Sequence, residues 1–285
     1  PAASAEIEAD LLLSGGIIHD GAGGPPVVGD VAVRDGRIVA VGKVAVEKAK
    51  RTIDCRGMIV APGFIDLHTH TDGTIDKPGV RPCLNYLTQG CTTMIVGNCG
   101  GSPVDIAGFL TGIRTNGSGV NILPLIGHGS VRNKIMRGER RPPSAEELEG
   151  MKELVDRAMR EGAWGMSTGL IYPPGSYAQT DELIALAKVV ASRGGIYVSH
   201  MRDEGARLLE AVAEAIRIGR ESGAAVHISH FKSMQIPNWG LVRKAAGLIG
   251  DARSGGLKIT ADQYPYTANS FALTDALLPE AEKIG

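Results

Sequence analysis

Residues 63–72 read GFIDLHTHTD, a short run of β-forming residues that ends in two histidines. Side chains two positions apart on a strand point to the same face, so the imidazoles of His68 and His70 are expected to project together. A His-X-His triplet also occurs by chance in loops, so by itself it does not establish a metal site. The pattern along the rest of the chain decides between these two interpretations.

Short apolar segments alternate with helical patterns from residue 58 onward. Ser144 and Glu147 form a capping box that predicts a helix over 144–161, and further helices are predicted to open at Thr180 and Glu204. Strands that alternate with helices favour parallel βα units. The predicted strands cover 63–68, 92–97, 120–126, 163–168, 195–199, 224–229 and 257–263. A (β/α)8 barrel has eight strands, so residues 58–285 are predicted to form a TIM barrel that is truncated before strand eight.

Residues 1–57 follow a different pattern, in which β-forming runs are separated by Gly and Asp turns. The dipeptide Asp35-Gly36 lies between VAVR and RIVAVG, which is a strong hairpin signal. We therefore predict a small antiparallel layer here, as a domain separate from the barrel that begins at residue 58.

Composition argues against several classes of function. The net charge is −1, so the chain has no basic field that would attract nucleic acid or an anionic membrane. No apolar run approaches the roughly 18 residues of a membrane span. The four cysteines are not closely paired, which favours free thiols and a reducing compartment. We expect no nucleic-acid or membrane partner and a cytoplasmic location, with a periplasmic or secreted one still open.

Three further potential metal ligands stand at the ends of predicted strands. Cys99 follows the second strand in MIVGNCGGS, and His200 and His230 end the fifth and the sixth. The carboxyl ends of parallel strands meet at one rim, where barrel active sites lie. A lone cysteine is more often a small buried hydrophobe, but this combined placement with the His-X-His triplet favours a metal site. Imidazole with thiolate favours Zn²⁺.

Neighbouring polar residues are assigned by strand alternation. His227 lies three residues before His230, so it is expected to point to the opposite face and pack between sheet and helices. Lys232 shares the parity of His230 and could reach the site as a cation, and Arg202 could do so after the fifth strand. His128 follows the third strand, where a structural role is favoured over metal ligation.

The sequence resembles the N-acyl-D-amino-acid deacylases (D-aminoacylases) of the amidohydrolase superfamily. His-X-His alone would indicate only the superfamily, whereas GNCG together with STGLIYPPG indicates this branch. The resemblance spans residues 11 to about 270 and lies in GFIDLHTHTD, VGNCGGS, GMSTGLIYPPGSYAQTDEL, YVSHMRDEG, VHISHFK and ADQYPYTA.

The resemblance implies a (β/α)8 barrel with a small β-sandwich, of which residues 1–57 would form the N-terminal part. It implies that Cys99, His200 and His230 hold one tightly bound Zn²⁺. His68 and His70 would contribute to a second, weaker metal site that shares Cys99.

The same resemblance implies that Tyr172 and Lys232 bind the substrate or polarise its carbonyl. The family takes its catalytic Asp from the end of strand eight, which is expected beyond residue 285; Asp262, on the predicted seventh strand, is not assigned that role. The predicted fourth strand, GMSTGL, lacks the Lys that bridges the metals of dihydroorotases and hydantoinases, which fits a branch with a Cys ligand. We expect a complementing C-terminal segment, without which residues 1–285 would be poorly soluble or inactive.

The resulting hypothesis is metal-dependent hydrolysis of an N-acyl-D-amino acid to a carboxylate and a free D-amino acid. One alternative is another amidohydrolase reaction, on a dipeptide with a D-residue, a cyclic amide or a lactone. The other is an inactive metal-binding fragment that lacks the catalytic Asp.

Overall fold

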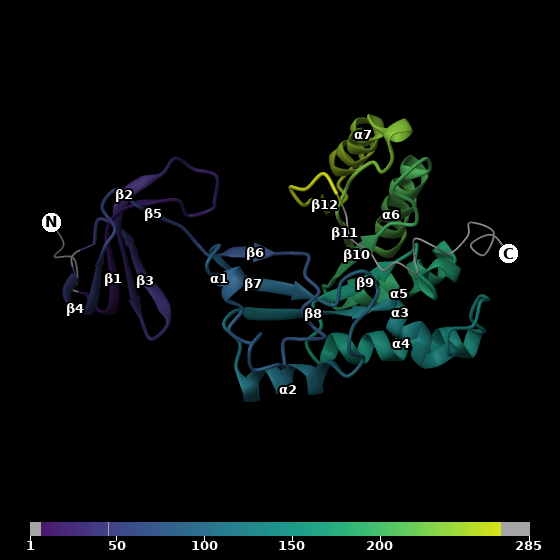
Figure 1. Cartoon of the computed structure of the whole chain (residues 1–285), viewed down its shortest axis with the longest axis horizontal. Coiled ribbons are helices and arrows are strands. Elements are labelled where there is room, and N and C mark those ends of the chain that lie inside the picture. The colour runs from purple at the N-terminus through teal and green to yellow at the C-terminus, as the bar shows by residue number, and fades with distance from the viewer. Residues whose placement is uncertain (1–6, 45, 269–285) are drawn as a thin grey trace. The chain divides into compact units, whose positions relative to one another are not determined.

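The computed structural model describes residues 7–44 and 46–268, and the chain divides into two compact units. The first unit is Pro1–Phe64 and the second is Ile65–Gly285 (Figure 1). This division falls later than the boundary predicted at residue 57, because β5 (Ile59–Val60) pairs with a strand of the N-terminal sheet.

The first unit is a sheet built around β1 (Ile7–Ile18). It pairs antiparallel with β2 (Val27–Arg34), and β3 (Arg37–Gly42) completes the hairpin predicted at Asp35-Gly36, where φ is 51° and 70°. However, β4 (Val46–Asp54) and β5 run parallel to β1, so the prediction of a purely antiparallel layer is wrong. Local patterns mark strands and tight turns, but they do not set the pairing direction of strands distant in sequence.

The second unit contains a curled parallel sheet whose seven strands stand side by side in chain order. Each of the seven predicted strands is present, with ends that differ by a few residues. The strands are β6 (Phe64–Asp66), β7 (Cys91–Val96), β8 (Asn121–Gly127), β9 (Gly165–Gly169), β10 (Ile196–His200), β11 (Ala225–Ile228) and β12 (Ile259–Ala261). The fold among the described residues is therefore an α/β barrel of the TIM type with seven of its eight strands.

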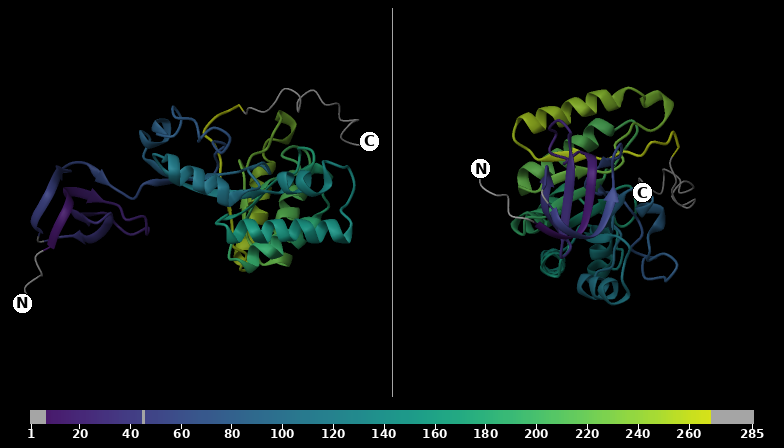
Figure 2. Two further views of the ribbon diagram at one scale, coloured as in Figure 1. Left: turned by 90° about the horizontal axis from the view of Figure 1, so that it is seen from below. Right: turned by 90° about the vertical axis from the view of Figure 1, so that its left-hand side faces the viewer.

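Helices connect these strands and cover the outer face of the sheet (Figures 1 and 2). The longer ones are α2 (Ile106–Asn116), α3 (His128–Met136), α4 (Ala145–Arg160), α5 (Thr180–Ser192), α6 (Leu208–Ser222) and α7 (Leu241–Ser254). Short turns of helix, α1 (Leu84–Leu87), η1 (Gly175–Tyr177) and η2 (Ile236–Asn238), interrupt the loops. No helix among the described residues combines the length and the apolar character needed to cross a membrane.

The three predicted helix starts have different outcomes. Ser144 caps α4, and its backbone N–H donates to the Glu147 carboxylate at 2.7 Å, which closes the capping box. Thr180 does not cap α5; its hydroxyl donates to Glu214 at 2.8 Å. Glu204 does not open α6, which begins four residues later at Leu208, so Glu204 is left in the loop after β10.

The main core lies between the sheet and the helices and is built from aliphatic side chains. Met151 and Val155 of α4 and Leu183 and Leu186 of α5 are completely buried there. Burial of each such side chain stabilises the fold by about 1.5–3 kcal/mol. Because the apolar positions of these helices recur at helical spacing, one stripe of each helix faces the sheet.

A buried cluster of polar and charged side chains joins α3, which follows β8, to α5. Glu182 on α5 contacts His128 Nε2 at 2.8 Å and Arg132 Nη1 at 2.5 Å, and all three side chains are almost fully buried. Burial alone raises the pKa of Glu182, but the hydrogen bonds and charges of His128 and Arg132 outweigh it and hold the pKa below its ordinary value. The structural role predicted for His128 agrees with this contact.

Replacing one partner of this group should destabilise the protein strongly. In Glu182→Ala, Arg132 would keep a buried charge without a counterion, and we expect a loss of about 3–5 kcal/mol in unfolding free energy. Asp181→Ala is the matched control, since the neighbouring Asp181 forms an exposed ion pair with Arg217 and should cost at most about 1 kcal/mol. Chemical denaturation measures both, and equal effects would contradict the assignment.

Candidate metal centre

The five predicted ligands all stand at the carboxyl edge of the curled sheet. His68 and His70 follow β6, Cys99 follows β7, His200 ends β10 and His230 follows β11. Parallel strands direct their carboxyl ends to the same edge, and the curl brings the ends of distant strands together. The structure thus places these side chains at one rim, as the sequence predicts, but it does not unite all five in one cluster of ligand atoms.

One group of ligand atoms in the described part of the chain consists of His68, Cys99 and His230, which lie within 4.8 Å of one another. The Cys99 Sγ lies 3.5 Å from His68 Nε2 and 3.8 Å from His230 Nε2. Tetrahedral Zn²⁺, with Zn–S near 2.3 Å and Zn–N near 2.05 Å, separates sulfur and nitrogen ligands by roughly 3.6 Å. Both sulfur–nitrogen separations therefore fit a zinc ion bound by the thiolate and the two imidazoles.

Carboxylates hold the other nitrogen of both histidines. His68 Nδ1 contacts Asp262 at 3.2 Å, and His230 Nδ1 contacts Glu204 at 2.6 Å. An ionised carboxylate can only accept, so Nδ1 carries the proton and each Nε2 presents a lone pair toward Cys99. Such carboxylate–histidine pairs orient metal ligands and raise their basicity.

Glu204 and Asp262 are the site residues that sequence reasoning missed. Burial alone raises the pKa of each carboxyl, but hydrogen bonds from the histidines outweigh it and hold both pKa values below the ordinary range. The sequence pattern predicts Glu204 at the start of a helix and Asp262 on the seventh strand, and neither position indicates a role in the site. Their position beside the predicted rim, within YVSHMRDEG and ADQYPYTA, was the available signal.

The position of His227 corrects a prediction made from strand alternation. Instead of packing between sheet and helices, its Nε2 contacts Asp262 at 2.8 Å and its Nδ1 contacts Thr260 at 2.8 Å. Strand β11 ends at Ile228, and His230 has a φ of 35°, in the left-handed region. Alternation does not extend across such a turn, so His227 and His230 both reach Asp262.

His200 is more buried than the other three predicted histidine ligands. Its ring is 4.3 Å from that of His230 and 4.8 Å from that of Tyr172, measured between centroids. Burial lowers the pKa of His200 to about 3, so the ring is neutral at pH 7. Both ring nitrogens are buried without a hydrogen-bond partner among the described residues, which is unusual and fits a nitrogen directed at a metal.

His200 forms a second ligand group with Glu204 and His230, whose ligand atoms lie within 4.8 Å of one another. His70 belongs to neither group in the described part of the chain, although its ring centroid is 5.3 Å from that of His68. The geometry therefore groups His68, rather than His200, with Cys99 and His230.

The two predicted substrate-binding residues flank the histidines. The Tyr172 ring stacks edge-on against His200. Lys232 Nζ donates to Glu204 at 2.6 Å and to the His230 carbonyl at 3.1 Å, and it lies 5.5 Å from the Tyr264 ring centre. Arg202 does not reach the metal ligands; it pairs with Glu214 at 2.9 Å.

The thiol of Cys99 is held in its neutral form in the absence of a cation. Burial raises its pKa to about 12, and the negative charges of Glu204 and Asp262 act in the same direction. A divalent metal reverses this preference, because it stabilises the thiolate directly.

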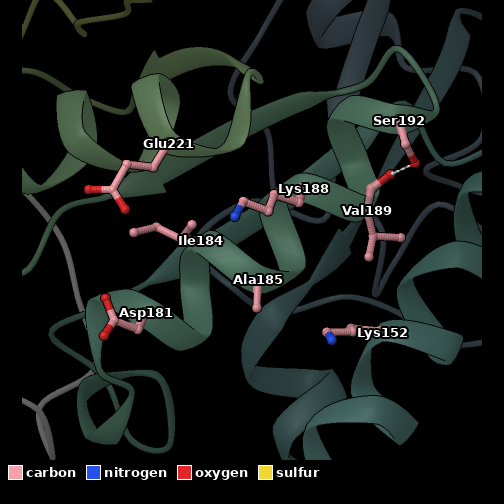
Figure 3. A pocket seen from close by; sticks show the side chains of 8 residues that line it. All are labelled: Lys152, Asp181, Ile184, Ala185, Lys188, Val189, Ser192 and Glu221. Carbon is pink, nitrogen blue, oxygen red and sulfur yellow. Dashed lines mark hydrogen bonds between the residues drawn. The ribbon is translucent and has the colours of Figure 1, made fainter.

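A surface hollow elsewhere on the barrel shares no residue with this centre. It has a volume of about 560 Å³ and lies between α4, α5 and α6, where its lining includes Lys152, Asp181, Lys188 and Glu221 (Figure 3). Its charged side chains carry both signs, and none belongs to the clusters of ligand atoms.

The amidohydrolase family profile matches residues 51–276 of this chain. A curled parallel sheet with a His-X-His triplet after its first strand and further ligands at later strand ends is consistent with that match. The chain belongs to the amidohydrolase family.

Curated relatives of this chain include deacylases of D-amino-acid derivatives. The D-aminoacylase of Alcaligenes xylosoxydans xylosoxydans is 38% identical over 93% of this chain, and the N-acyl-D-glutamate deacylase of the same organism is also 38% identical over 93%. The chain covers 59% and 58% of these two proteins, so it spans less than two thirds of their length.

Solved structures agree with these relatives. The N-acyl-D-glutamate deacylase of Bordetella bronchiseptica, complexed with zinc and a phosphonate inhibitor, has a TM-score of 0.86 at 37% identity and covers 91% of this chain and 59% of its own. A D-aminoacylase also has a TM-score of 0.86 at 37% identity, covering 92% and 59%. The L-hydantoinase of Arthrobacter aurescens, 18% identical with a TM-score of 0.60 over 90% of this chain and 58% of its own, shows the fold alone. The close structural neighbours thus bind metal in an amidohydrolase centre.

Removing the Glu204 carboxylate should weaken metal binding. In Glu204→Gln, a neutral amide replaces the carboxylate that accepts the hydrogen bond from His230 Nδ1. We expect zinc affinity to fall by about 10- to 100-fold. Competition with a chromogenic chelator measures this change. Glu210→Gln, on the exposed side of α6, is the control and should bind zinc like the wild type.

Metal affinity should also depend on pH. Because the pKa of Cys99 is raised to about 12, zinc must displace its proton throughout the neutral range. Binding that releases one proton strengthens about tenfold per pH unit, so affinity should rise from pH 6 to pH 8. Chelator competition at several pH values gives the slope, and a flat profile would show that the Cys99 thiolate is not a ligand.

Proposed function

We propose that the protein is a metal-dependent hydrolase that cleaves N-acyl-D-amino acids into a carboxylate and a free D-amino acid. The observation that carries this proposal is the convergence of His68 Nε2, Cys99 Sγ and His230 Nε2 at separations that fit zinc. The D-aminoacylase and N-acyl-D-glutamate deacylase relatives supply the substrate class. A bound Zn²⁺ would polarise the scissile carbonyl and lower the pKa of the attacking water.

The ligand assignment follows from how each side chain is held. Cys99 and His230 belong both to the group seen here and to the tight site that the resemblance implies. His68 completes the group by its 3.5 Å separation from Cys99. His200, with its unpartnered ring nitrogens, supports a further ligand position. We propose one tight zinc site among Cys99, His230, His68 and His200. A second, weaker site would include His70.

Tyr172 and Lys232 are proposed to bind the substrate. Lys232 has a side chain that is only 15% exposed, and its ammonium is paired with Glu204 beside His230. A cation held there is suited to a carbonyl or carboxylate oxygen that approaches the metal ligands. Tyr172 forms an edge of the same space against His200 and could donate its hydroxyl to that oxygen.

The group that moves the proton is proposed to lie outside residues 7–268. Glu204 and Asp262 are already bound to His230 and to His68 with His227, and their lowered pKa values make them weak bases. A carboxylate from a complementing segment would take the proton of water and deliver it to the leaving amine. This is the role that the resemblance gives to the Asp of strand eight.

Purified full-length protein loaded with zinc should hydrolyse N-acetyl-D-methionine, N-acetyl-D-glutamate or N-acetyl-D-aspartate and leave the L-forms intact. Release of free amino acid measures the reaction. Cys99→Ala should lose both tight zinc binding and turnover.

Turnover of dihydroorotate in place of these amides would favour the cyclic-amide alternative, which 28% identity to a Pelotomaculum thermopropionicum dihydroorotase also suggests. Zinc binding without turnover of any amide would indicate a non-catalytic metal protein.

A further inference from the structure

The loop that carries Cys99 has an unfavourable backbone conformation. Gly97, Cys99 and Gly100 have φ angles of 79°, 54° and 80°, all in the left-handed region. Glycine adopts this region freely, but a residue with a side chain such as cysteine rarely does. The position of the Cys99 Sγ therefore depends on contacts that hold this loop from outside.

One buried hydroxyl on a different strand holds both ends of the loop. Ser167, in the middle of β9, is completely buried. Its Oγ accepts the backbone N–H of Gly100 at 3.0 Å and donates to the backbone carbonyl of Gly97 at 2.5 Å. The two bonds span Cys99 in the sequence, so they set the turn at which its side chain leaves the backbone.

The loop and β9 also touch backbone to backbone. A Cβ added to Gly100 would lie 2.7 Å from the Gly169 nitrogen, and one added to Gly169 would lie 2.2 Å from the Cys99 carbonyl oxygen. On the side of the first strand, the Asn98 amide donates to the carbonyls of Thr69 and Ile95. Asn98 thus joins the loop to the segment after β6 and to β7, and Ser167 is the described side chain that joins it to β9.

We propose that Ser167 is a positioning residue for the metal centre: it holds the 97–100 loop so that Cys99 Sγ faces His68 Nε2 and His230 Nε2. By this means the fourth strand of the barrel contributes to the centre without supplying a ligand. The inference rests on the proposed metal site, but not on the identity of the substrate.

Thr168 provides a matched control on the same strand. Its side chain is also a completely buried hydroxyl, one residue further on, and therefore on the other face of β9. It contacts Tyr197 Oη and Ser199 Oγ at 3.1 Å, and none of its hydrogen bonds goes to the Cys99 loop. Removing either hydroxyl disturbs a buried hydrogen-bond network, but only Ser167 acts on the loop.

The test compares Ser167→Ala and Thr168→Val in the full-length protein. Zinc affinity is measured by chelator competition, and the rate of alkylation of Cys99 by iodoacetamide is measured in the metal-free protein by peptide mass spectrometry. We expect Ser167→Ala to bind zinc about 10- to 100-fold more weakly and to alkylate faster at Cys99. Thr168→Val should match the wild type in both measurements within about threefold, even if both variants melt at a lower temperature.

Unchanged zinc affinity and alkylation in Ser167→Ala would overturn the proposal, as would equal losses in Thr168→Val. If Ser167→Ala does not fold, Ser167→Cys decides, since its thiol keeps the approximate size of the side chain but forms weaker hydrogen bonds. A loss of zinc affinity in that variant supports the proposal, and wild-type affinity rejects it. Failure of the wild type itself to bind zinc would instead refute the proposed metal site.

Discussion

The carboxylate of Asp262 ties the two ends of the curled sheet together. It follows β12, the last described strand, and contacts His68 Nδ1 at 3.2 Å after β6, the first strand of the same sheet. It also accepts from His227 and from the backbone N–H of His230 at 2.6 Å. These contacts exist only because the sheet curls. They direct His68, after the first strand of the sheet, toward Cys99 and His230, which follow other strands.

Burial favours the neutral form of both kinds of titratable group at this rim, but hydrogen bonds override it at the two carboxyls. Burial raises the pKa of Cys99 to about 12 and lowers that of His200 to about 3, so both side chains are neutral at pH 7. Glu204 and Asp262 stay ionised because histidines donate to them. The site thus combines neutral ligand atoms with two carboxylates that are hydrogen-bonded to the histidines. This arrangement favours a divalent cation and orients the imidazoles.

Fold prediction succeeded where the information is local. The alternation of short apolar strands with helical stretches located every strand of the curled sheet, and the capping box at Ser144 located α4. The fold prediction failed where strand pairing or strand ends depend on distant contacts, as in the parallel pairing of β1 with β4. His227 is the clearest case: β11 stops at Ile228, before His230, so strand alternation does not relate the directions of these two side chains.

The sequence by itself determined which residues reach the carboxyl rim, because strand position and the common direction of parallel strands require no knowledge of the tertiary contacts. His68, Cys99, His200 and His230 were found in this way. Only the tertiary structure decided which of them face one another and what holds them, including the roles of Glu204, Asp262 and Ser167. Those roles depend on the curl of the sheet and on left-handed turns after the strands, which bring together residues up to 194 positions apart.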